Sequence, residues 1–113
     1  MNDVHGKFEY KGKTYRLVFN LNAMEQIQEE YGSLGAWGDT AAEGEGNIKA
    51  IKFGFAAMIN EGIAIENEEN GTDLPPFTLP QIGRMLSDIG IEKVAEMLHQ
   101  IVKDSTKGDE KNE

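Results

Sequence analysis

Apolar and polar residues alternate with a period of two along the first twenty residues of the chain. The apolar positions are Phe8, Tyr10, Tyr15, Leu17 and Phe19. This alternation is typical of strands with one buried face. Lys11 and Gly12 separate the two runs, and glycine adopts positive φ at little cost. We therefore expect a tight β-hairpin with a glycine bulge at Gly12.

The apolar spacing then changes to the three and four residues of a helix. Leu21, Met24, Ile27 and Tyr31 recur on one face. Asn22 is the predicted N-cap, with Glu25 three residues on to complete a capping box, and Gly32 is the predicted end. Residues 33–46 contain four glycines and little apolar bulk besides Trp37, which predicts a mobile connection.

A central buried helix is predicted from Asn47, because Phe53, Ala56 and Ala57 widen the apolar face that runs from Ile48 to Ile59. Gly62 is the expected end of this helix. The polar residues 66–73 that follow predict a loop, which Pro75 and Pro76 close.

Two amphipathic helices complete the pattern. Thr78 and Gln81 form a capping box at the start of the first helix, with Pro80 in its first turn, and Gly90 separates it from the second. The apolar faces are Leu79, Ile82, Met85, Leu86 and Ile89, then Ile91, Val94, Ala95, Leu98, Ile101 and Val102. We predict a mostly helical α+β fold, an N-terminal β-hairpin followed by about four α-helices. Residues 1–104 would form a single domain and residues 105–113 a flexible charged tail.

Charge separates the chain into unlike parts. The 113 residues carry a net charge of −9, and residues 21–78 hold eleven acids against only Lys49 and Lys52. Such a surface repels phosphate backbones, so nucleic-acid binding is disfavoured and a basic protein partner would be attracted. The first residues lack the features of a secretory signal, and no apolar run approaches a membrane span. We expect a cytoplasmic protein.

Candidate catalytic and metal-binding residues are sparse. There is no cysteine, and the two histidines, His5 and His99, have no partner at ligand spacing. The acidic loop aligns with a calcium loop at Gly71 but places Phe77 where a bidentate glutamate is required. The serines lack a nearby histidine or a GxSxG setting. We therefore expect neither enzymatic activity nor a cofactor.

Protein binding is the remaining class of function. Trp37, alone in a glycine-rich segment, either covers the core or anchors a partner, and the former is favoured. The stripes of the last two helices are core in most proteins, yet a fold this small can leave one face open. The candidate partner-binding residues are Trp37, Met85, Leu86 and Leu98.

Residues 15–32, YRLVFNLNAMEQIQEEYG, resemble the start of the tail assembly chaperones of long-tailed bacteriophages, prophages and gene transfer agents. The matching positions are Leu17, Phe19, Asn22, Ala23, Met24, Glu25 and Gly32. The later layout is also similar, with a central helix from Ile48, a helix start at Thr78 and Leu79, and a terminal helix with Val94 and Leu98.

This resemblance implies a protein that binds the tape measure protein in multiple copies, keeps its hydrophobic helices soluble and helps to recruit tail tube subunits. It brings no enzymatic motif and transfers no binding residue. Self-association into a homo-oligomer would also cover an open apolar face. Two alternatives come from the composition: an acidic inhibitor that mimics DNA, and a small hydrolase or metal enzyme built on the abundant carboxylates.

Overall fold

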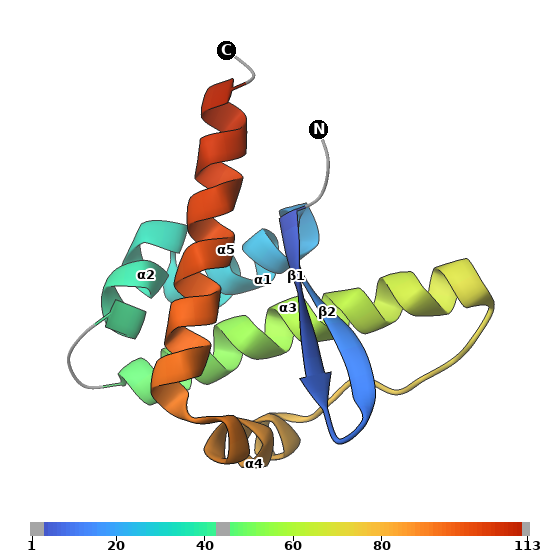
Figure 1. The fold of residues 1–113 in the computed structure, drawn as a ribbon. Helices are drawn as coiled ribbons and strands as arrows, with labels where there is room; N and C mark the ends of the chain where they lie inside the picture. The colour runs from blue at the N-terminus through green and yellow to red at the C-terminus, as the bar shows by residue number, and fades with distance from the viewer. Residues whose placement is uncertain (1–3, 43–45, 112–113) are drawn as a thin grey trace.

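The computed structural model describes residues 4–42 and 46–111, with side chains for residues 6–42 and 46–105. Within them an antiparallel hairpin precedes five helices (Figure 1). The elements are β1 (Val4–Tyr10), β2 (Lys13–Phe19), α1 (Leu21–Tyr31), α2 (Leu34–Ala42), α3 (Asn47–Asn70), α4 (Leu79–Ile89) and α5 (Ile91–Lys111). The predicted mostly helical α+β fold is confirmed. The additional helix is α2, where a mobile connection was predicted.

The hairpin is regular along its length. Its strands pair one to one, from Val4 opposite Phe19 to Tyr10 opposite Lys13. Lys11 and Gly12 form the two-residue loop with φ of 51° and 81°. Two consecutive positive φ values define a turn whose twist matches that of the strands. The tight hairpin is confirmed, and the expected bulge is wrong because no extra residue interrupts the register.

The long helix α3 crosses behind the hairpin and passes the base of α5 (Figure 1). β2 crosses it at Gly62, where an added Cβ would lie 2.2 Å from the backbone oxygen of Arg16. Gly62 therefore permits close strand packing and does not end the helix as predicted. The end is Gly71, with φ of 66°, so residues 66–70 of the predicted acidic loop are helical.

Residues 71–78 return along α3 in extended form, held by two asparagines. The Asn60 amide donates to the Phe77 oxygen (3.0 Å) and accepts from the Phe77 nitrogen (2.8 Å). Asn67 makes the same pair of bonds with Leu74 (3.0 and 2.9 Å). Seven residues of helix rise about 10.5 Å, and three residues of extended chain span about 10 Å. The two spacings match, so both asparagines bind the same returning segment.

Helix boundaries follow from local hydrogen bonds. Asn20, not the predicted Asn22, caps α1 by accepting from the Ala23 nitrogen at 3.1 Å. The predicted capping box of Thr78 and Gln81 is confirmed at the start of α4. Gly90 separates α4 from α5 with φ of 108°. α5 is helical to Lys111, and Ser105 on it is buried.

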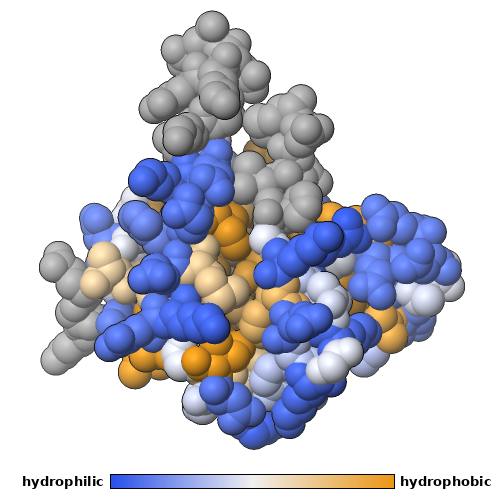
Figure 2. Space-filling model, viewed as in Figure 1, coloured by the Kyte–Doolittle hydropathy of each residue, from blue (hydrophilic) through white to orange (hydrophobic). Residues whose placement is uncertain are grey.

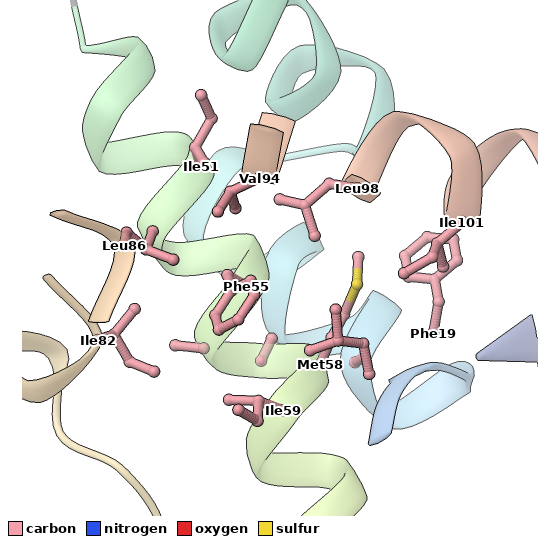
Figure 3. Close-up of a cluster of buried hydrophobic side chains, with 14 of the residues drawn as sticks. Phe19, Ile51, Phe55, Met58, Ile59, Ile82, Leu86, Val94, Leu98 and Ile101 are labelled. Atoms are coloured by element: carbon pink, nitrogen blue, oxygen red, sulfur yellow. The ribbon is translucent and has the colours of Figure 1, made fainter. Parts of the chain in front are cut away.

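The core lies where α3 meets the other elements. Phe55, Met58 and Ile59 of α3 are fully buried, and side chains of α4 and α5 converge on them (Figure 3). Phe8 of β1 packs edge-on against Phe55, with 5.4 Å between ring centroids. Among the described residues no helix is long and apolar enough to cross a membrane.

Candidate protein-binding surface

Trp37 closes one side of the core from α2. Its Nε1 donates to the Ala50 oxygen of α3 at 2.9 Å, and the side chain is buried. An added Cβ at Gly54 would lie 2.3 Å from Trp37 Cζ2, so the indole occupies the space that any side chain at position 54 would need. The geometry is that of a residue covering the core.

Met85, Leu86 and Leu98 also belong to the core, each with an exposed fraction of 3% or less. The structure does not bring these residues and Trp37 together on one surface. Each instead lines the inner wall of a surface depression: Trp37 and Leu98 share one, and Leu86 and Met85 line one each. Their role in partner binding stays a prediction.

The depression shared by Trp37 and Leu98 is an apolar cleft between α2 and α5. Its volume is about 130 Å³, close to the roughly 150 Å³ cavity that accommodates a benzene ring. Small side chains at Ala41 and Ala95 leave the space, and the exposed His99 lies on its wall. The cleft is large enough for one apolar side chain of a partner.

A second apolar depression, here called the Ile48 groove, lies between α3 and α4 and reaches the start of α5. It consists of two adjoining hollows of about 350 and 280 Å³ that share Ile48 and Lys52. Leu86 and Ile91 line the first hollow, and Phe53 and Leu79 line the second. Ile48 is 58% exposed and Leu79 46% exposed. Figure 2 shows hydrophobic surface at the lower left, over the start of α3 and the turn between α4 and α5.

A third depression, of about 500 Å³, lies between the hairpin tip and α4 and is lined by both polar and apolar residues. The Tyr10 hydroxyl donates to Asp88 Oδ2 at 2.7 Å, which joins β1 to α4. This hydrogen bond raises the pKa of Tyr10 above its ordinary 10.0. Arg84 also lines the depression. The arrangement binds the hairpin to α4.

Two carboxylates of α3 connect it to neighbouring elements. Glu61 accepts from the side-chain amides of both Asn20 and Asn22, at 2.8 and 3.0 Å. Glu69 pairs with Arg16 at 3.0 Å, which joins α3 to β2. No group of three or more His, Asp or Glu residues within the described segments is placed to hold a metal ion. The side chain of His5 lies outside those segments.

The chain matches no protein-family model, no curated protein and no solved structure. Among the described residues, the cleft between α2 and α5 and the Ile48 groove are openings with more apolar than polar surface.

Sequence reasoning missed Ile48, Lys52 and Leu79 as surface residues. Ile48 and Leu79 fit the apolar faces of their helices and were assigned to the core, yet both stand at the first turn of a helix, where neighbouring elements cover least. One signal was available: Lys49 and Lys52 are the only cations among residues 21–78. Both lysines line the Ile48 groove.

Proposed function

We propose that this protein is a tail assembly chaperone of the phage type, which binds the tape measure protein in several copies and assists tail tube assembly. It would act in the cytoplasm of the bacterial host. The resemblance over residues 15–32 motivates this assignment, and the strand-to-helix course of β2 and α1 is compatible with it.

The observation that carries the proposal is the pairing of apolar openings with an acidic body. A tape measure protein of the phage type offers long hydrophobic helices, which require apolar grooves to cover them. The Ile48 groove and the cleft between α2 and α5 are of this kind. The net charge of −9 would keep an array of chaperone copies soluble, and many copies on one partner would add avidity.

Co-expression with a phage tape measure protein, the partner that the proposal assigns, tests the proposal. The expected result is a soluble complex in which light scattering gives more than one copy of this chain per partner. Ile48→Ser should weaken the complex because Ile48 is exposed in the groove. The matched control is Leu21→Ser, which changes another exposed side chain, 78% exposed, at the start of α1.

The control should leave the complex intact. The proposal would be overturned if no complex formed and the tape measure protein remained insoluble. Equal loss with Ile48→Ser and Leu21→Ser would place the contact outside the Ile48 groove.

A further inference from the structure

Lys52 lies inside the apolar Ile48 groove. It is half-buried, and among the described residues it makes no ion pair or hydrogen bond. Its side chain lies against α4 at Gly83, where an added Cβ would be 3.3 Å from Nζ. A lysine held there loses part of its hydration and gains no anion in return, which is unfavourable unless a ligand supplies one.

Lys49 adds a second positive charge at the edge of the same groove. Its Nζ is 3.9 Å from Glu30 on α1, and both side chains are largely in solvent, so their attraction is weak. Glu30 also lines the groove, so its charged residues, two lysines and one glutamate, sum to +1 within a stretch of the chain that holds eleven acids. This local sign is opposite to that of the whole molecule.

The walls of the groove determine the backbone form of an occupant. They are built from the helices α1, α3, α4 and α5, and no strand of the described residues lines them. An extended peptide would find no strand edge here and would leave its own N–H and C=O groups unpaired. A helix satisfies them internally and can place an apolar stripe over Ile48 and Leu79.

We propose that the Ile48 groove binds an amphipathic helix of a partner protein that carries a carboxylate next to its apolar stripe, and that Lys52 pairs with this carboxylate. The inference rests on the proposed function, because it specifies which helices of a partner this chain would select. Long-range repulsion by the acidic surface is screened beyond about 8 Å at physiological salt, whereas the ion pair forms at contact.

Three synthetic helical peptides of about 18 residues, long enough to form helix on a surface, provide the test. They share one leucine stripe and differ at a single flanking position, which is Glu, Gln or Lys. Fluorescence anisotropy at about 0.15 M salt measures their affinities, a salt level that screens attraction of the Lys peptide to the acidic surface. The Glu peptide should bind about tenfold more tightly than the Gln peptide, as expected for a charge-assisted hydrogen bond.

Variants of this chain assign the effect to Lys52. Lys52→Gln should make the Glu and Gln peptides bind alike, and Ile48→Ser should weaken all three. Lys103→Gln, an exposed lysine on α5 outside the groove, is the charge-matched control and should change neither comparison. Circular dichroism confirms that each variant is folded.

Equal binding of the Glu and Gln peptides to the unaltered protein, or tighter binding of the Lys peptide, would overturn the inference. So would a Glu preference that survives Lys52→Gln. Failure of the proposed function is distinguishable: the tape measure protein would then remain unbound while the peptide series still followed the pattern above. If the tape measure protein binds but the peptides are not discriminated, only this inference fails.

Discussion

The indole of Trp37 fills the space beside the α3 backbone at Gly54, and this fit gives a prediction. An added Cβ at Gly54 would lie 2.3 Å from Trp37 Cζ2, so Gly54→Ala must displace the indole and its hydrogen bond to Ala50. We expect a loss of about 1–3 kcal/mol in the free energy of unfolding, although alanine is the better helix former. Urea denaturation measures it.

Gly38→Ala in α2 is the matched control. An added Cβ at Gly38 meets no atom within 4 Å, so only the gain in helix propensity remains. This variant should be more stable than the unaltered protein by about 0.5–1 kcal/mol. The decisive result is a lower free energy of unfolding for Gly54→Ala and a higher one for Gly38→Ala. A stabilising Gly54→Ala would contradict the packing of Trp37 against Gly54.

Tyr10 predicts a pH dependence of stability. Its hydrogen bond to Asp88 raises its pKa above the ordinary 10.0, so the folded state favours the neutral phenol. The resulting stabilisation is complete below about pH 10 and is lost as the pH rises through the folded-state pKa. Tyr10→Phe should therefore be less stable than the unaltered protein at about pH 8, and the difference should shrink by about pH 11.

Thermal unfolding at each pH measures this difference. Asp88→Asn provides a second check, because removing the charge should lower the pKa of Tyr10. The absorbance of the phenolate measures this pKa. Parallel loss of stability in Tyr10→Phe and the unaltered protein would show that the hydrogen bond to Asp88 does not contribute.

At the residue scale, sequence reasoning was limited by competition between similar side chains. Asn20 and Asn22 both precede an apolar helical face, and either can cap. The structure uses Asn20, while Asn22 donates to Glu61, which lies 39 residues further along the chain. That distant acceptor is invisible to local pattern. The capping box at Thr78 was predictable because no second candidate stands beside it.

At the scale of elements, the asparagines of α3 determine the path of residues 71–78. Asn60→Ala removes both hydrogen bonds to the Phe77 backbone and leaves that N–H and C=O without these partners. We expect a loss of about 1–3 kcal/mol and faster hydrogen exchange at Phe77. Asn70→Ala, an exposed asparagine at the end of α3, is the control and should have little effect.

Hydrogen exchange at Leu74 distinguishes local opening around Phe77 from destabilisation of the whole protein. Asn67 still binds Leu74 in the Asn60→Ala variant, so a local change should raise exchange at Phe77 more than at Leu74. Unchanged exchange at Phe77 would mean that the returning segment does not depend on Asn60.

Two elements were mispredicted because their glycines were interpreted as positions where a helix cannot form or must end. Residues 33–46 looked too rich in glycine for a helix, yet Ser33 Oγ accepts from the Ala36 nitrogen at 3.0 Å at the start of α2, and Trp37 buries against α3. Gly62 looked like a helix end but is required by the crossing of β2. In both cases tertiary packing outweighed local propensity, which sequence pattern alone does not report.

For the whole molecule, the order of elements was readable from sequence but the open surface was not. Apolar periodicity identifies the apolar face of a helix. It does not distinguish a face that is buried in the core from one that lines an open groove. Met85, Leu86 and Leu98 were chosen from such faces and Trp37 from a glycine-rich segment, and all four are buried. Exposure of Ile48 depends on how α1, α3 and α4 diverge, which involves residues far apart in the chain.

The acidic surface gives a prediction for the whole molecule. Residues 21–78 carry a local charge of −9 in the folded chain. Mutual repulsion disfavours the compact state and weakens when salt screens it. Raising the ionic strength from about 0.01 to about 0.15 M should therefore stabilise the protein, on the order of 1 kcal/mol or about 4 °C in Tm.

Neutralising exposed acidic side chains should stabilise the protein in the same way without added salt. Glu25, Glu29 and Glu68 are exposed and have no ion pair within the described residues. Changing all three to glutamine should raise the Tm at low ionic strength and reduce its further rise with salt. Glu69→Gln is the contrasting variant, because it breaks the pair with Arg16 and should not raise the Tm. A Tm that falls with added salt in the unaltered protein would mean that attractive pairs such as Arg16 with Glu69 outweigh the repulsion.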